Sequence, residues 1–392
     1  MSPLFIKSSA TYFWYFGILG LTAPFLAVFL DGKGFSSLQI GEILAIFTAT
    51  KIFGPTIWAM LADKTGKQLS IIQMGAFLAC LFFAGLIFVD TYWPVTFLLA
   101  MFSLFWTAIL PQLEVMTLTS VRRSAKIYAR IRLWGSIGFI VLAVASGEIL
   151  SRYSSDAFSY IGLFVLISLY ISTLFFKQPH IHSARVMNPS SIVEKLTQWG
   201  FVVFFLAGLL LQMSFGPFNG FFALYLRDLA YPSYAVGLLI AVGVIAEIAI
   251  FVYAGRLFQA FTVKSLLTFC MFISALRWYL VGEYGDNVWI LSFTQLIHAA
   301  GFAIYHSASM QFIQLHFNAN QQNRGQAVYI GGVYGIGGAI GAYITGALWQ
   351  GGNGAQLAFF FAAATVLVAG ILMLFLPHPK RPPIISQPSE LQ

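Results

Sequence analysis

Long apolar runs recur along the whole chain and are separated by short polar segments. Each run holds about 20 residues, the length that a helix needs to cross the roughly 30 Å hydrocarbon core of a bilayer. The pattern therefore predicts an all-α integral membrane protein with twelve transmembrane helices. The runs cover residues 9–30, 38–61, 70–89, 94–118, 129–150, 157–176, 200–226, 235–255, 265–283, 288–312, 325–349 and 355–376.

A polar stretch near the middle of the chain interrupts this pattern. Residues 177–198 contain Pro179 and Pro189 and lack a long apolar run. We interpret them as a cytoplasmic linker between an N-terminal six-helix half, residues 1–176, and a C-terminal six-helix half, residues 199–392.

An internal repeat relates the two halves at an offset of 196 residues. Residues 25–30 (FLAVFL) align with residues 221–226 (FFALYL), and Ser37 and Gly41 then align with Ser233 and Gly237. Parallel six-helix repeats, related by an axis along the membrane normal, place a substrate site near the midplane at their interface. The repeat therefore predicts two pseudo-symmetric halves around a central transport site.

Composition favours lipid over water as the surroundings of the chain. Hydrophobic residues make up 59% of it and charged residues 9%, against about 45–50% and about 25% in ordinary soluble domains. The two cysteines, Cys80 and Cys270, lie far apart inside apolar runs. We therefore expect no disulfide, no Cys-x-x-Cys metal site and no cofactor.

The positions of the basic residues predict the orientation, because basic loops stay in the cytoplasm. If both termini are cytoplasmic, the cytoplasmic segments hold sixteen Lys and Arg residues and the outer loops hold only Lys33, Arg152 and Arg227. This asymmetry also accounts for the net charge of +8, so no nucleic-acid binding is expected. The sixteen are Lys7, Lys64, Lys67, Arg122, Arg123, Lys126, Arg130, Arg132, Lys177, Arg185, Lys195, Arg256, Lys264, Arg324, Lys380 and Arg381.

Several ionisable residues nevertheless fall inside the apolar runs, where a charge costs several kcal/mol and marks a candidate functional site. At the repeat offset Lys51 aligns with Glu247, which predicts that both face a shared cavity. Lys51 and Arg277 are candidate ligands for an anionic solute, and Glu247 is a candidate proton carrier. The candidates are Lys51, Glu114, Arg132, Glu247, Arg277, His298 and His306.

Structural alternatives remain open for these groups. Glu247 and Arg277 are expected either to couple protons to transport or to form a structural ion pair. His298 and His306 are eight residues apart and nearly on one helical face, so they are either a proton relay or packed interior histidines. Pro217 predicts a helix bend beside a cavity, and Asn219 and Tyr305 are expected to line it.

The loop after the second run carries a recognisable motif. Residues 59–67 read AMLADKTGK, which resembles the G-x-L-x-D-[RK]-x-G-[RK] loop of the major facilitator superfamily, with Ala59 in place of the first glycine. The resemblance implies a gating loop formed by Asp63, Lys64, Gly66 and Lys67. The alternative is an ordinary positively charged cytoplasmic loop.

A second resemblance covers the fourth and fifth runs. Residues 111–114 (PQLE) and 128–139 (YARIRLWGSIGF) resemble the lactose permease type of proton symporter. Carried over by position, Glu114 and Arg132 become the substrate-binding pair, and Phe139 occupies the place of a stacking tryptophan. The alternative is that Arg132 lies at the cytoplasmic start of its helix and not in the substrate site.

Nearly the whole chain resembles the 3-phenylpropionate transporter branch of the superfamily. The resemblance rests on residues 130–136 (RIRLWGS), 242–247 (VGVIAE), 277–278 (RW) and 326–329 (QAVY), with His298 and His306. It implies a monomeric bacterial inner-membrane symporter that uses protons to import a small organic anion such as an aromatic acid. A sugar or nucleoside proton symporter is the alternative.

Other functional classes fit the chain less well. An enzyme should carry a nucleophile and base constellation or an HExxH motif, and the chain has neither. A membrane scaffold would not need seven ionisable groups inside its spans. Among the candidate residues, three cations against two anions leave one positive charge, which a monoanionic carboxylate would neutralise.

Overall fold

The computed structural model describes residues 3–121, 124–176, 191–318 and 320–377. Twelve helical segments in these ranges are long and apolar enough to cross a membrane, which confirms the twelve predicted runs. The N-terminal spans are α1 (Pro3–Gly32), α2 (Ser37–Thr65), α3 (Gln68–Ala84) with η1 (Gly85–Ile87), α4 (Tyr92–Trp106) with α5 (Ile109–Ser120), α6 (Ala125–Arg152) and α7 (Ala157–Leu174).

The C-terminal spans are less regular, because three of them contain a π-helical segment. The first is α9 (Trp199–Ser214), η2 (Pro217–Phe221) and α10 (Phe222–Asp228), followed by α11 (Ser233–Ala260) and α12 (Val263–Glu283). Then come α13 (Val288–Ala299), η3 (Ala300–Ile304) and α14 (Tyr305–His316), and next α15 (Gln322–Tyr329), η4 (Ile330–Gly337) and α16 (Gly338–Trp349). The last span, α17 (Ala355–Leu374), follows η5 (Gln350–Gly352).

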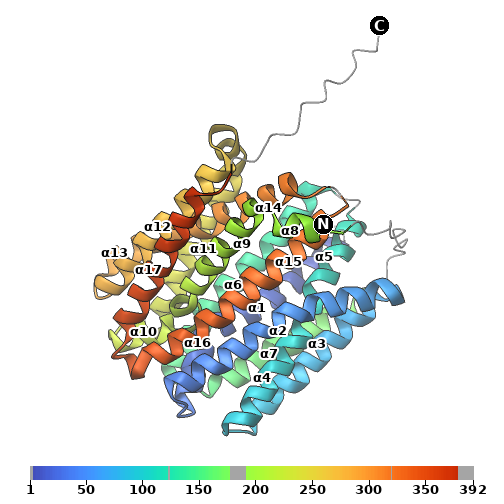
Figure 1. Cartoon of the computed structure of the whole chain (residues 1–392). Coiled ribbons are helices and arrows are strands. Elements are labelled where there is room, and N and C mark those ends of the chain that lie inside the picture. The colour runs from blue at the N-terminus through green and yellow to red at the C-terminus, as the bar shows by residue number, and fades with distance from the viewer. Residues whose placement is uncertain (1–2, 122–123, 177–190, 319, 378–392) are drawn as a thin grey trace.

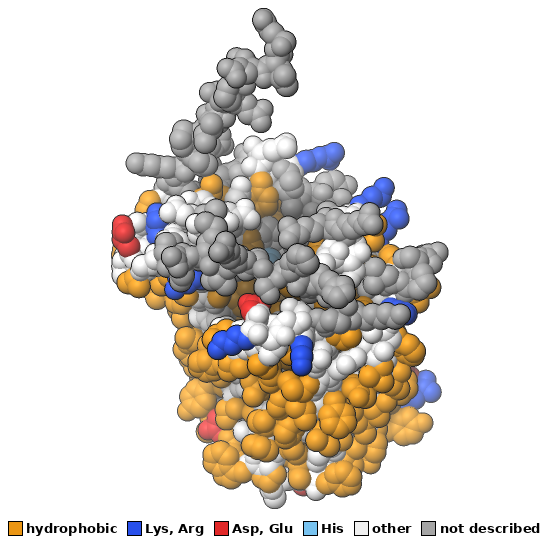
Figure 2. All heavy atoms as spheres, turned by 90° about the vertical axis from the view of Figure 1, so that its right-hand side faces the viewer, with side chains coloured by type: hydrophobic (Ala, Val, Ile, Leu, Met, Phe, Trp, Pro, Cys, Tyr) orange, Lys and Arg blue, Asp and Glu red, His pale blue; other side chains and the backbone are white. Residues whose placement is uncertain are grey.

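The helices form one bundle in which both described chain ends lie at the same end, as an even number of spans requires (Figure 1). Figure 2 shows an apolar belt around the face in view, with most of its lysine and arginine side chains toward the end that carries the termini. We call this the inner end and the opposite one the outer end.

Glycines let helices from the two halves approach closely near the outer end. A Cβ atom at Gly41 of α2 would lie 2.7 Å from the Cα atom of Gly346 in α16. A Cβ atom at Gly237 of α11 would lie 2.6 Å from the Ala143 carbonyl oxygen in α6. Neither distance leaves room for a side chain, so the two crossings depend on glycine. Gly41 and Gly237 are equivalent positions of the repeat and make equivalent contacts.

Polar contacts join the halves at the same end. The Arg227 guanidinium at the end of the seventh span lies 2.5 Å from the Asp31 carboxylate at the end of the first, and 3.0 Å from that of Asp228. Asp31 and Arg227 are themselves separated by the repeat offset of 196 residues, so equivalent positions carry opposite charges and meet. The Gly351 N–H donates to Ser37 Oγ at 2.9 Å.

The described end of the linker packs against the C-terminal half. Residues 177–190 of the predicted linker lie outside the described residues, and α8 (Val193–Thr197) follows them. Gln321 Nε2 donates to the Ser191 carbonyl at 2.7 Å, and His316 Nε2 donates to the Lys195 carbonyl at 2.8 Å. This part of the linker is therefore bonded to the inner end of the C-terminal half.

We predict that the Asp31–Arg227 pair holds the outer ends of the halves together. Both side chains are partly exposed, at 38% and 50%, so the pair contributes only ~0.2–1 kcal/mol. Asp31→Asn should therefore raise outside access to a reporter cysteine at Leu44, which packs beside Gly220 of the other half, by roughly two- to fivefold. The measurement is the labelling rate with a membrane-impermeant maleimide after Cys80 and Cys270 are replaced by serine.

The charge-swapped double variant, Asp31→Arg with Arg227→Asp, is the control and should restore slow labelling. Equal labelling rates in all three proteins would show that the pair does not hold this end closed.

Candidate functional site

The loop between α2 and α3 has the turn that its motif predicts. Gly66 has a φ of 64°, in the left-handed region that favours glycine, and its N–H bonds to the Ala62 carbonyl. Asp63, Lys64 and Lys67 are exposed around it. No hydrogen bond or ion pair of Asp63 is found among the described residues, so a latch to another helix stays a prediction.

The first polar cluster lies in the N-terminal half. The Tyr128 hydroxyl donates to Glu114 Oε1 at 3.2 Å. The Arg132 guanidinium lies 3.9 Å from the ring centre of Phe16 in α1, which stabilises the cation on an aromatic face. Arg132 and Glu114 form no direct salt bridge, but they are close enough to interact electrostatically. The structure therefore brings this predicted pair together, with Arg132 about two turns inside α6.

Three other predicted site residues have different surroundings. Phe139 is half-buried in α6, where its carbonyl packs against Gly20 of α1. Asn219 is exposed on η2. Tyr305 is 0% exposed, and its hydroxyl packs beside Gly208 of α9. Of these three, Asn219 is the most exposed and Tyr305 is closed off from a solute.

The second polar cluster lies in the C-terminal half around Glu247. Glu247 Oε1 of α11 and His298 Nε2 of α13 are 2.8 Å apart, and their side chains are 15% and 13% exposed. Phe215 and Phe218 pack against the imidazole ring, with centroid distances of 5.9 and 5.2 Å. Glu247 is thus paired with a histidine in a nearly dry environment.

Arg277 stands beside this pair but is held by other groups. Its side chain is 1% exposed and lies between two aromatic rings, 4.2 Å from the centre of Phe218 and 4.1 Å from that of Trp278. Its Nε donates to the Thr294 carbonyl at 3.0 Å and its Nη2 to Gln295 Oε1 at 3.4 Å. Arg277 therefore acts on Glu247 through its charge, and the direct partner of Glu247 is His298.

His306 does not share the surroundings of His298. The π-helical segment η3 lies between them and changes the helical phase. His306 Nδ1 lies 3.3 Å from the hydroxyl of Tyr334 on η4. The expected alignment of the two histidines assumed an uninterrupted α-helix, and the structure instead gives them different partners.

Lys51 is the predicted cation with the fewest partners. It lies at the middle of α2 and is half-buried, with Nζ 5.0 Å from the ring centre of Phe47. Among the described residues no carboxylate or hydrogen-bond acceptor contacts it. The next residue, Ile52, packs against Gly335 of η4, so Lys51 lies near the interface of the halves.

Some residues of these clusters were not identified from the sequence. Tyr128 precedes Arg132 by four residues, a spacing that places both on one helical face. Glu42 also lies inside an apolar run, and its Oε2 accepts a hydrogen bond from the Tyr92 hydroxyl at 2.8 Å. The position of a carboxylate inside an apolar run would have identified Glu42. No pattern in the sequence singled out Thr294 and Gln295, which accept hydrogen bonds from Arg277.

Comparison with known proteins gives the same architecture. The MFS_1 like family matches residues 5–361. The chain is 26% identical over 354 residues to the "Probable 3-phenylpropionic acid transporter" of Escherichia coli (strain K12), covering 86% of this chain and 89% of that protein. It is 24% identical over 374 residues to the "Maltose permease" of Geobacillus stearothermophilus, covering 93% and 92%.

Solved transporter structures share the fold. A crystal structure of a variant of the nucleoside transporter NupG superposes with a TM-score of 0.85 at 16% identity, covering 95% of this chain and 99% of that one. An auto-inhibited POT family peptide transporter superposes with a TM-score of 0.74 at 13% identity, covering 99% and 98%.

Substitution of the two central cations, Arg277 and Lys51, should have different effects on the stability of the protein. Arg277→Lys keeps the charge but loses the planar stack and the fixed donors, so we expect a loss of ~2–4 kcal/mol in apparent stability. Lys51→Met removes a charge without a partner and should leave stability unchanged or higher. The measurement is the apparent Tm of each purified variant in one detergent. A Lys51→Met variant less stable than Arg277→Lys would contradict this division of roles.

Proposed function

Because the chain belongs to the MFS_1 like family of major facilitator transporters, we propose that it is a proton-coupled symporter that imports a small organic anion. The proposed solute is an aromatic acid of the 3-phenylpropionate type. The carrying observation is Lys51, a cation at the middle of a span that no described acidic residue neutralises.

The charge balance supports an anionic solute. Holding a cation within the membrane without a counter-ion is costly, and a bound carboxylate would supply that counter-ion. Arg277 is less suited to this role, because its side chain is 1% exposed and already stacks and donates within the C-terminal half. We therefore assign the solute carboxylate to Lys51 and a supporting electrostatic role to Arg277.

Arg132 and Glu114 complete the proposed site from the N-terminal half. Arg132 lies over Phe16, so one side of the cluster is apolar and aromatic and the other is polar. This combination suits a solute with a ring at one end and a polar group at the other. Asn219, exposed on η2, is the proposed contact from the C-terminal half.

We assign proton coupling to Glu247 and His298. A carboxyl group in dry surroundings favours its protonated form, whereas a nearby guanidinium or entering water favours the charged form. Alternating access changes both influences, so Glu247 can load a proton from one side and release it to the other. His298, 2.8 Å away, is the proposed relay, and His306 beside Tyr334 is a candidate contact on the solute path.

The same proposal gives the location and orientation. We place the protein in a bacterial inner membrane as a monomer, with both termini in the cytoplasm, because basic residues are concentrated at the inner end. The loop with Asp63 and Gly66 is then cytoplasmic and suited to act as a gating loop.

A sugar or nucleoside symporter is the second candidate. It is supported by the maltose permease among the relatives, by the nucleoside transporter among the structures, and by the closeness of Glu114 and Arg132. Neutral solutes would leave Lys51 without a counter-ion, which is why we rank this function second.

Binding by purified protein should distinguish the two candidates. We expect 3-phenylpropionate to bind more tightly than its neutral amide, maltose or uridine. Lys51→Met should lose about 30-fold or more of its affinity for the acid, because the buried charge pair is broken. Lys264→Met is the control, since Lys264 Nζ donates to the Leu374 carbonyl at the inner end. Undiminished acid binding by Lys51→Met would exclude Lys51, whereas binding of maltose or uridine alone would favour the second candidate.

Transport by proteoliposomes should test the proton site. Glu247→Gln mimics the protonated carboxyl, so this variant should still bind and exchange solute but lose accumulation driven by a pH gradient. His298→Gln should show a partial defect, because water can replace a relay. Glu42→Gln is the matched control, being another hydrogen-bonded glutamate within a span. Normal accumulation by Glu247→Gln would move the proton site elsewhere, with Glu114 the next candidate.

A further inference from the structure

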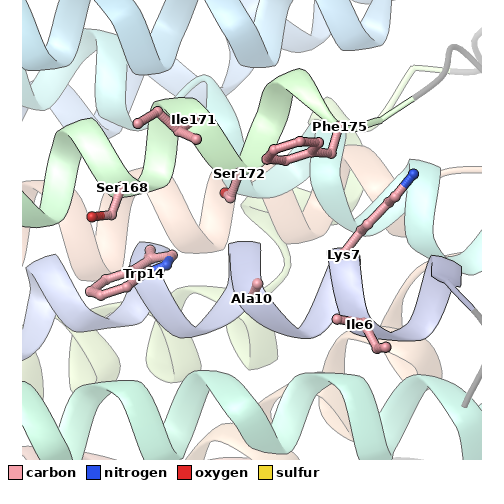
Figure 3. A pocket seen from close by; sticks show the side chains of 8 residues that line it. All are labelled: Ile6, Lys7, Ala10, Trp14, Ser168, Ile171, Ser172 and Phe175. Carbon is pink, nitrogen blue, oxygen red and sulfur yellow. The ribbon is translucent and has the colours of Figure 1, made fainter.

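A groove of about 410 Å³ opens on the outside of the N-terminal half, between α1 and α7 at the inner end. It shares no residue with the two polar clusters described above. Figure 3 shows Lys7 toward one end of the groove and Trp14 toward the other, with Ala10 between them. The lining residues are Ile6, Lys7, Ala10, Trp14, Ser168, Ile171, Ser172 and Phe175.

The floor of the groove is closed by small residues and an inter-helix hydrogen bond. Thr11 Oγ1 donates to Ser172 Oγ at 3.0 Å, and Ser172 Oγ donates to the Leu169 carbonyl at 2.6 Å. Ala10 adds little volume between the larger side chains on either side. The helices are thus bonded to each other beneath a hollow that their own side chains do not fill.

The walls of the groove face the bilayer. Ile6, Ile171 and Phe175 are among the exposed large apolar residues, and Phe164 and Ile167 continue the exposed apolar face along α7. A membrane-facing groove with such walls is complementary to a hydrocarbon chain.

The rim of the groove is cationic. Lys7 is half-buried near the start of the first span, which begins at Phe5. Within the described residues its amino group has no acidic partner or hydrogen-bond acceptor, and the indole N–H of Trp14 is likewise without an acceptor. A lysine at the end of a span extends its amino group toward the headgroups, where anionic lipid attracts it.

We propose that this groove binds an anionic phospholipid of the leaflet at the inner end. The lipid phosphate pairs with Lys7, and one acyl chain lies along Ala10 toward Trp14. The net negative charge of the headgroup distinguishes this ligand from a zwitterionic lipid, whose own cation competes with Lys7.

A second groove provides an internal contrast. It lies between α12 and α17 at the same end, has a volume of about 440 Å³ and is also topped by a lysine, Lys264. There the amino group donates to the Leu374 carbonyl at 2.7 Å. The Lys264 ammonium is therefore already bonded to a backbone acceptor of the protein, so we expect selectivity for anionic lipid at Lys7 rather than at Lys264.

The test is a lipid titration of the purified, delipidated protein followed by native mass spectrometry. For the first bound lipid, wild type should prefer dioleoylphosphatidylglycerol over dioleoylphosphatidylcholine by about fivefold, the effect of one lysine near an anionic surface. Lys7→Gln should abolish this preference, and Lys264→Gln should keep it. Apparent Tm values close to wild type are required of both variants.

The Ala10→Leu variant tests recognition of the lipid acyl chain separately from recognition of the headgroup charge. This substitution keeps Lys7 but fills the floor of the groove, so the affinity for the first bound phosphatidylglycerol should fall several-fold. Soluble glycerol 3-phosphate, added in excess, should not displace the lipid, because it has no chain for the groove. The proposal is overturned by equal binding of the two lipids to wild type, by a preference that survives Lys7→Gln, by unchanged binding to Ala10→Leu, or by displacement with glycerol 3-phosphate alone.

Discussion

The cost of placing charge inside a membrane explains much of the arrangement of this protein. Arg277 is stabilised by two aromatic faces and two hydrogen-bond acceptors, and Glu247 by a histidine 2.8 Å away. Arg132 lies over Phe16 in the N-terminal half. Each of these charges is compensated within its own half. Lys51 is the contrasting case among the described residues, and an uncompensated charge is the feature through which a solute can contribute binding energy.

Close helix approach is the second physical requirement, and it links the repeat to the way in which the halves meet. Helices in lipid gain little from burying apolar surface, so they associate through close packing at small residues. Gly41 with Gly346, and Gly237 with Ala143, provide two such crossings near the outer end. The pairing of Asp31 with Arg227 adds a polar contact at the same end. The outer ends of the halves are therefore held by contacts that repeat the pseudo-symmetry of the sequence.

The C-terminal half departs from regular geometry where the candidate site lies. The π-helical segments η2, η3 and η4 each interrupt a span, and residues on or beside them include Phe218, His298, His306 and Tyr334. A wider helical turn changes the direction of every side chain that follows it. This is why His298 contacts Glu247 while His306, eight residues later, contacts Tyr334. In the N-terminal half, Glu114 of α5 and Arg132 of α6 lie near each other on α-helical segments that contain no π-helical turn.

The number and approximate positions of the spans, the concentration of basic residues at the inner end and most ionisable residues inside the spans follow from the sequence alone, because hydropathy and charge position are local properties. The resemblance of residues 111–114 and 128–139 also indicated that Glu114 and Arg132 lie close enough to interact, as they do in the structure. The partners of each buried charge could not be predicted, because they depend on which faces of separate helices meet across the bundle. A structural ion pair of Glu247 with Arg277 was one of two alternatives, and the fold instead pairs Glu247 directly with His298 and surrounds Arg277 with aromatic rings. Pairing of this kind is decided by tertiary packing, since a π-helical turn or a glycine crossing re-aims side chains without changing the hydropathy of the span.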